Sequence, residues 1–172
     1  RHHSTKNLGR DAVNCDEQQS IQVANAIAEY AMLHRAHCIV FEHLNMQGKK
    51  HGNKKQKLAM WRKQYIQQLV AHKAHRKGIR ISRICASGTS KLAYDGSGKT
   101  IRNQENHSIC KFATGKVYNC DLSASYNIGA RYYIREMLKT LPAKVRSQVE
   151  AKVPQLARRT SCTLSTLINL NA

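Results

Sequence analysis

The pattern of apolar and polar positions near the start of the chain predicts a helix followed directly by a strand. Residues 1–12 are polar, basic and without a period. At Asn14 an N-x-x-E sequence supplies a capping side chain, and apolar residues then recur at helical spacing to about Arg35. The next segment, 38–44, begins with four consecutive apolar residues and carries Glu42. It predicts a short strand that is covered on both faces and has a carboxylate at its end.

A second helix and a second strand are predicted after a polar loop at 47–57 that is rich in Gly and Lys. Along 58–77 an apolar stripe at helical spacing consists of Leu58, Trp61, Tyr65, Leu69 and His72. This spacing favours core packing for the two aromatic residues. Gly78 is suited to the position that follows a helix end. Residues 79–86 then alternate between apolar and polar, which is typical of a strand with one buried face.

The second half of the chain predicts a turn-rich region and three helices. A short strand, a turn and a strand are expected over 110–118. Asp121 is suited to cap a helix over about 122–139. The expected core face of that helix consists of Leu122, Ser125, Tyr126, Gly129, Tyr133 and Met137. Further helices are expected over 143–151 and about 160–171.

The excess of basic residues adds a prediction about the binding partner. At 172 residues the chain has the length of one domain, and it carries 29 Lys and Arg residues against 10 Asp and Glu residues, a formal charge of +19. No acidic residue occurs between Glu42 and Asp95. The basic residues concentrated there predict binding to a polyanion, above all nucleic acid. The expected contacts are Lys54, Lys55, Arg62, Lys63, Lys73, Arg76, Lys77, Arg80 and Arg83.

The sequence contains neither a membrane-spanning apolar run nor a secretion signal at its start, so we expect a cytoplasmic protein with no membrane partner. A basic helix lying on a membrane surface is an alternative that requires the stripe along 58–77 to be exposed. The six cysteines are scattered and form no C-x-x-C pair, so we expect free thiols and no structural zinc. Cys38 and Cys85 fall in predicted strands and are expected to be small core residues.

Two carboxylates stand out, Glu42 at a strand end and Asp121 at a helix start. Each has an ordinary alternative, because a strand-end carboxylate can face water and Asp is a common N-cap. Together, in so basic a chain, they predict a Mg²⁺ or Mn²⁺ site. These hard ions prefer carboxylate and phosphate oxygens, and they activate water for hydrolysis of a phosphodiester.

Two segments resemble a known family. Residues 39–44, Ile-Val-Phe-Glu-His-Leu, resemble the I-V-x-E-D-L segment of the RuvC-like nuclease domain of TnpB proteins, transposon-encoded RNA-guided nucleases related to type V CRISPR effectors. Residues 121–128, Asp-Leu-Ser-Ala-Ser-Tyr-Asn-Ile, resemble that family's D-x-N-A-A-x-N-I segment. A basic helix, a strand and a turn at 88–90 lie between them in a similar order. The resemblance covers about 11–138.

The resemblance implies an α/β fold of the RNase H-like (RuvC-like) type, with a mixed sheet flanked by helices. It implies a nuclease core over 1–140, a reduced zinc-ribbon insertion at about 87–119 and a helical tail over 141–172. It further implies Mg²⁺-dependent DNA cleavage in which Glu42 and Asp121 are the second and third of three acids. DNA and a guide RNA are the implied partners, in a prokaryotic cytoplasm.

The sequence departs from the family's pattern in ways that affect the expected function. The strand with the family's first Asp has no counterpart, since Asp11 and Asp16 lie before or at a predicted helix start. We therefore expect the first strands to be absent from this chain. The chain would then be a fragment, be completed by a partner chain, or rearrange its structure. Two functions stay open. One is a Mg²⁺-dependent nuclease domain or fragment, and the other is an inactive nucleic-acid-binding relative in which Glu42 and Asp121 are relics.

Overall fold

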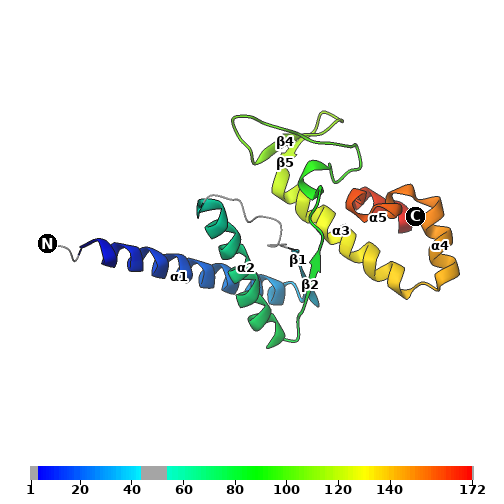
Figure 1. Cartoon of the computed structure of the whole chain (residues 1–172). Coiled ribbons are helices and arrows are strands. Elements are labelled where there is room, and N and C mark those ends of the chain that lie inside the picture. The colour runs from blue at the N-terminus through cyan, green and yellow to red at the C-terminus, as the bar shows by residue number, and fades with distance from the viewer. Residues whose placement is uncertain (1–3, 44–53, 172) are drawn as a thin grey trace. The chain divides into compact units, whose positions relative to one another are not determined.

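Helices and short strands both occur in the chain, which has a mixed α/β structure (Figure 1). The computed structural model describes the backbone of residues 4–43 and 54–171 and the side chains of residues 16–43 and 62–170. The chain divides into two compact units. The first comprises Arg1–Ile39 and Leu44–Ser82, and the second comprises Val40–His43 and Arg83–Ala172.

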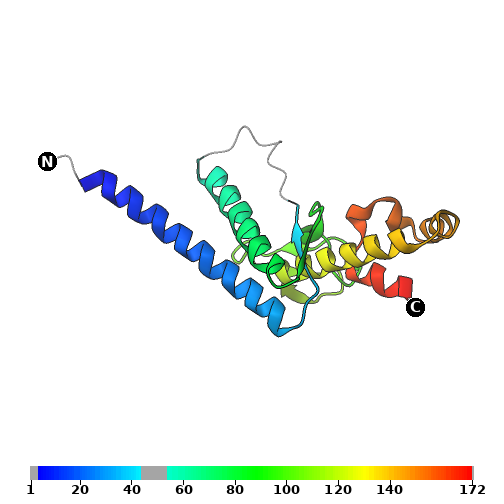
Figure 2. The ribbon, with the colours of Figure 1, turned by 90° about the horizontal axis from the view of Figure 1, so that it is seen from below.

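The first unit is built on two helices, α1 (Ser4–Leu33) and α2 (Lys54–His75), which pack against each other (Figure 2). Ala31 near the end of α1 and Ala74 near the end of α2 are buried in one cluster with Ile79. Because two of these side chains are small, the helices approach closely at this point. This buried cluster of the first unit therefore lies near the carboxyl ends of its helices.

The end of α2 is a Schellman motif, which explains how the helix stops. The Ile79 amide donates to the Ala74 carbonyl (2.9 Å), and the Gly78 amide donates to the His75 carbonyl (3.1 Å). Gly78 has a φ of 69°, in the left-handed region that favours glycine. The prediction that Gly78 follows the end of this helix is confirmed.

The end of α1 has the same geometry. The Ala36 amide donates to the Ala31 carbonyl (2.8 Å), and Arg35 takes the left-handed position with a φ of 51°. The start of α1 differs from the prediction, because the helix begins at Ser4 and the expected cap at Asn14 is wrong. The helical turns before Asn14 supply the carbonyl acceptors that make a cap unnecessary there.

Each helix leads into a short strand, and the two strands are parallel. They are β1 (Cys38–Glu42) and β2 (Arg80–Ile84). The Arg80 amide donates to the His37 carbonyl (3.0 Å), and the His43 amide donates to the Ile84 carbonyl (2.7 Å). Both predicted strands are confirmed. The residues of β1 are half-buried, however, and in the described part of the chain its sheet contains only β1 and β2.

The second unit contains a separate antiparallel sheet. Its strands, in spatial order, are β3 (Ile101–Arg102), β4 (Ile109–Lys111) and β5 (Val117–Asn119). Cys110 pairs with Tyr118, and Gly115 lies in the turn with a φ of 86°, so the predicted strand, turn and strand are confirmed. Cys110, Phe112 and Cys120 are buried together. In the described residues the parallel and antiparallel strands thus form two sheets, where one mixed sheet was expected.

The rest of the second unit is helical (Figure 1). Its helices are α3 (Cys120–Thr140), α4 (Ala143–Lys152) and α5 (Leu164–Asn171), with 3-10 segments η1 (Thr89–Lys91), η2 (Pro154–Ala157) and η3 (Arg159–Ser161). Ile134, Leu138, Leu156 and Cys162 form its second core cluster. The predicted helix over 143–151 is confirmed, whereas the last helix is shorter than expected. Within the described ranges, no helix combines the length and apolar character needed to cross a membrane.

The buried face of α3 differs from the predicted one. Leu122, Tyr126 and Tyr133 are exposed by 48%, 41% and 62%. The buried residues are Cys120, Ser123, Asn127, Ala130, Arg131, Tyr132, Ile134 and Leu138. Asn127 and Arg131 are buried because their side chains donate to backbone carbonyls of other segments. Apolar periodicity cannot detect a core face that is held by polar side chains.

The cysteines also differ in part from expectation. Cys85 is exposed and Cys38 is half-buried, so the prediction of a core position is wrong for Cys85. The buried thiols are those of Cys110, Cys120 and Cys162. All five of these described cysteines are free.

Candidate carboxylate site and nucleic-acid interface

Glu42 is the last residue of β1 and belongs to the second unit. The His43 amide bonds to the Ile84 carbonyl, which fastens this end of β1 to the last residue of β2. In parallel sheets under helices, ligands bind beyond the carboxyl ends of the strands. The half-buried Glu42 therefore lies at the strand end where a binding site is expected.

Asp121 lies in the first turn of α3, which follows β5 without a loop. The cap of this helix is Asn119, whose Oδ1 accepts hydrogen bonds from the Asp121 and Leu122 amides, each at 2.9 Å. The expected N-cap role of Asp121 is wrong, because Asn119 satisfies these amides in its place. Asp121 is exposed at the start of the helix, and capping does not occupy its carboxylate.

The two carboxylates belong to the same compact unit. Their oxygen donors are of the type that Mg²⁺ and Mn²⁺ prefer. In the part of the chain that the structure describes, no group of three or more His, Cys, Asp or Glu side chains is placed to hold a metal. A metal ion held by Glu42 or Asp121 would therefore need further ligands from substrate phosphate, water or another polypeptide.

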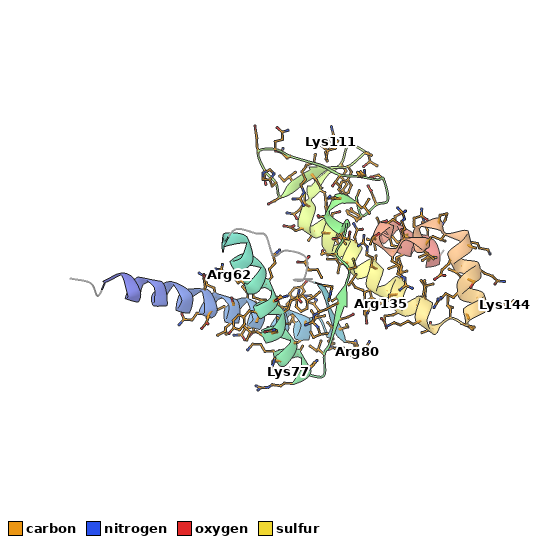
Figure 3. The ribbon with its side chains drawn as sticks, viewed as in Figure 1. Arg62, Lys77, Arg80, Lys111, Arg135 and Lys144 are labelled. Carbon is orange, nitrogen blue, oxygen red and sulfur yellow. The ribbon has the colours of Figure 1, made fainter. Side chains whose placement is uncertain are left out.

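The basic residues predicted to contact nucleic acid divide between the units. The first unit holds Lys54, Lys55, Arg62, Lys63, Lys73, Arg76, Lys77 and Arg80, and the second holds Arg83. Lys54 and Lys55 begin α2, and their side chains lie outside the described residues. Lys63, Arg76, Lys77, Arg80 and Arg83 are exposed, and Lys73 is half-buried. Figure 3 labels Lys77 and Arg80 of this set. Exposure of this kind leaves most of the predicted set accessible to a phosphate backbone.

Arg62 is an exception within this set. Its guanidinium forms an ion pair with Asp16, and the two side chains are 37% and 34% exposed. The Arg62 Nε is buried and has no hydrogen-bond partner among the described atoms. Asp16 thus competes with an external phosphate for Arg62, which weakens the case for Arg62 as a direct contact.

One side of α2 forms an open groove of about 320 Å³, lined by Tyr65, Gln68, Leu69, His72, Lys73 and Arg76. Of the predicted stripe, Tyr65 and Leu69 are half-buried and His72 is exposed, so the prediction of a buried stripe is wrong for His72. The core side of α2 is instead formed by Val70 and Ala74, both 0% exposed. The side chains of Leu58 and Trp61 lie outside the described residues. An aromatic ring beside cationic side chains is an arrangement on which single-stranded nucleic acid can stack.

Three arginines that the sequence did not single out lie around a cavity in the second unit. Arg131, Arg135 and Arg159 line it together with Arg83, which was predicted. They come from β2, α3 and η3, so no single local pattern joins all four. A signal in the sequence was the i, i+4 spacing of Arg131 and Arg135 on a predicted helix.

The sequence matches no protein-family model, and no curated protein matches it. The resemblance to RuvC-like nucleases therefore rests on residues 39–44 and 121–128 and on the order of the elements between them.

Proposed function

We propose that this chain binds nucleic acid through its exposed lysine and arginine side chains. The observation that carries this proposal is the charge, +19 from 29 basic and 10 acidic residues. A phosphate backbone is the partner that matches such a charge, because its neutralisation releases condensed counterions. DNA is the first expected partner, and a guide RNA is the second by resemblance.

Fluorescence anisotropy with labelled duplex DNA, single-stranded DNA and RNA tests this proposal. Affinity for duplex DNA should fall with salt, with a slope of about −0.9 for each phosphate contacted. Arg76→Gln and Lys77→Gln should each reduce that slope by about 1. Lys152→Gln, an exposed position on α4, removes the same charge and serves as the control. Absence of salt-dependent binding to all three nucleic acids contradicts the proposal. Anionic vesicles that outcompete DNA favour the membrane-surface alternative.

Glu42 and Asp121 support a second, more specific proposal, that the chain is part of a RuvC-like nuclease with an RNase H-like fold. Support comes from the two segments that resemble the family and from the position of Glu42 at the end of a parallel strand. It also comes from the carboxylate of Asp121, which does not cap α3. A bound Mg²⁺ or Mn²⁺ ion supplies activation of water and stabilisation of the leaving oxygen. Glu42 and Asp121 would hold that ion, and the basic side chains would hold the strand.

The domain boundaries and the location belong to the same proposal. The nuclease core would cover 1–140 and the tail 141–172, which contains α4 and α5. The reduced zinc ribbon would correspond to the region of β3, β4 and β5. A prokaryotic cytoplasm would be the location.

Cleavage of labelled DNA in Mg²⁺ separates the nuclease from the inactive alternative. We expect cleavage when a second polypeptide supplies the strand with the family's first Asp, which has no counterpart in this chain. Glu42→Gln and Asp121→Asn should each lower the rate by at least about 100-fold, because metal affinity depends on the ligands. Both variants should retain DNA binding. Glu105→Gln, in an exposed turn, is the matched control. If the two variants cut as fast as the parent, the carboxylate assignment is wrong.

A further inference from the structure

A cavity of about 180 Å³ in the second unit is lined by four arginines. Arg83 comes from β2, Arg131 and Arg135 from α3, and Arg159 from η3. Cys85 and Thr160 also line it. We refer to it as the arginine cavity. Its volume is below the range typical of pockets for whole drug-sized ligands, so it suits a single small group.

Arg131 forms the buried wall of the arginine cavity and is 5% exposed. Its Nε donates to the Cys162 carbonyl (3.1 Å), and its Nη1 donates to the carbonyls of Cys85 and Ser87, each at 2.9 Å. Its Nη2 donates to the Thr160 carbonyl. These bonds hold the guanidinium rigidly, but every acceptor is a neutral backbone group.

The positive charge of Arg131 is consequently not balanced by its hydrogen bonds. In the described residues no carboxylate forms an ion pair with it, and its burial lowers its pKa. A buried charge is costly unless an opposite charge accompanies it. The arginine cavity beside it is the place where an anion could supply that charge.

Contacts with Arg83, Glu136 and Tyr132 help to position Arg135 at the same cavity. Its Nη1 donates to the Arg83 carbonyl (3.1 Å), its Nε donates to the Glu136 carboxylate (2.9 Å), and its Cζ lies 5.5 Å from the centre of the Tyr132 ring. Glu136 is shared with Lys139, whose Nζ lies 3.1 Å from the same oxygen. Glu136 therefore contacts both Arg135 and Lys139 on this side of the cavity. Figure 3 shows Arg135 on α3.

We propose that the arginine cavity binds a phosphate group of a nucleic-acid backbone. Guanidinium groups present paired N–H donors that match phosphate oxygens, and four arginine residues line this small cavity. The source of the phosphate rests on the proposed nucleic-acid binding. The site itself does not, since inorganic phosphate has the same chemistry.

Cys85 provides a reporter for the test, because it lines the cavity and its residue is exposed. The full chain is treated with iodoacetamide, a neutral reagent, and alkylation of each cysteine is followed by mass spectrometry of its peptide. Inorganic phosphate and a short single-stranded DNA are the two probes. Each should slow alkylation of Cys85 several-fold. Alkylation of Cys38, which does not line the cavity, should be unchanged.

Substitutions of arginines that line the cavity distinguish phosphate binding in the cavity from a general effect of positive charge. Arg159→Gln should abolish the protection of Cys85 and lower the salt slope of DNA binding by about 1. Arg158→Gln removes the same charge from the neighbouring exposed residue and should leave both unchanged. Arg135→Gln is a second rim variant. Arg131 is left intact because it ties the carbonyls of four residues, and circular dichroism checks that each variant folds.

Each outcome decides one point. Protection by both probes, lost in Arg159→Gln and kept in Arg158→Gln, supports the proposal. If phosphate protects Cys85 from alkylation and DNA does not, the cavity does not bind the phosphate of a nucleic acid. It then binds small phosphates instead. Absence of protection by either probe, or equal loss in Arg158→Gln, overturns the cavity. If the chain fails to bind DNA at all, the proposed function fails, while the phosphate experiment still tests the cavity.

Discussion

The side-chain Oδ1 of Asn127 accepts a hydrogen bond from the Leu164 amide at 3.2 Å. The Nδ2 of the same carboxamide donates to the carbonyls of Thr89 (3.0 Å) and Leu92 (2.9 Å). Asn127 is 0% exposed, so all three bonds depend on one buried side chain. A single residue of α3 thereby holds both the η1 segment and the first residue of α5.

Replacing Asn127 should destabilise the second unit. Asn127→Ala removes three hydrogen bonds and leaves buried backbone groups without partners, which should lower the free energy of unfolding by about 2–4 kcal/mol. Urea denaturation followed by circular dichroism measures this loss. Asn103→Ala is the control, because Asn103 also accepts backbone amides but lies in an exposed turn. Equal losses in the two variants would show that burial of Asn127 contributes nothing.

The start of α3 should depend on Asn119 and not on Asp121. Asn119→Ala removes the cap and should cost about 1 kcal/mol of stability, whereas Asn119→Asp should retain most of it. Asp121→Ala should have a smaller effect, since its carboxylate does not cap the helix. Thermal unfolding of the three variants tests this order. A larger loss of stability for Asp121→Ala than for Asn119→Ala would mean that Asp121 is the N-cap.

The ion pair of Asp16 and Arg62 should contribute little to the packing of α1 on α2. Both side chains are about one-third exposed, so solvent screens the interaction. A double-mutant cycle with Asp16→Ala and Arg62→Ala should give a coupling free energy of about 0.5 kcal/mol. Repeating the cycle at high salt should reduce it further. A coupling several times larger, insensitive to salt, would contradict a screened pair.

Stability at alkaline pH should depend on the thiol of Cys110. Burial, together with the neighbouring Cys120 thiol, raises the pKa of Cys110 from 9.0 to about 11. The folded state then holds this proton at pH values where the unfolded chain has lost it. The resulting stabilisation is complete below pH 9 and is lost as the pH rises through about 11.

Comparison with Cys110→Ala isolates this contribution, because lysines and tyrosines also titrate in the same range. Urea denaturation over a pH series should show a steeper alkaline loss in the parent chain than in the variant. The difference in slope should not exceed about 1.4 kcal/mol per pH unit for one group. Parallel curves for the two proteins would mean that the Cys110 proton is not linked to folding.

Strands and helix ends that depend on residues adjacent in the sequence could be predicted from the sequence. The alternation around 80–84 became a strand, because side chains on a strand repeat every two residues. The continuous apolar run ending at Glu42 also became a strand. Gly78 took the left-handed position after α2, because a residue without Cβ has no steric penalty there. The start of α1 was missed, since a capping sequence permits a helix to begin but does not oblige it to.

The faces of the helices were decided by tertiary contacts. Apolar spacing alone favoured Tyr126 and Tyr133 as core residues of α3, yet Asn127 and Arg131 are buried instead. Their burial becomes favourable only when carbonyls from η1, from the segment after β2 and from η3 arrive to accept their hydrogen bonds. Those carbonyls are distant in sequence, so no local pattern contains them.

The candidate sites divide in the same way. The sequence by itself determined the large positive charge and singled out Glu42 and Asp121, because residue types and their order are enough to indicate that chemistry. Only the tertiary structure showed that Asn119, and not Asp121, is the N-cap of α3. It also showed that Arg83, Arg131, Arg135 and Arg159 line one cavity. The physical reason is that hydrogen bonds and cavities are formed between segments, and their partners are selected by folding of the whole unit.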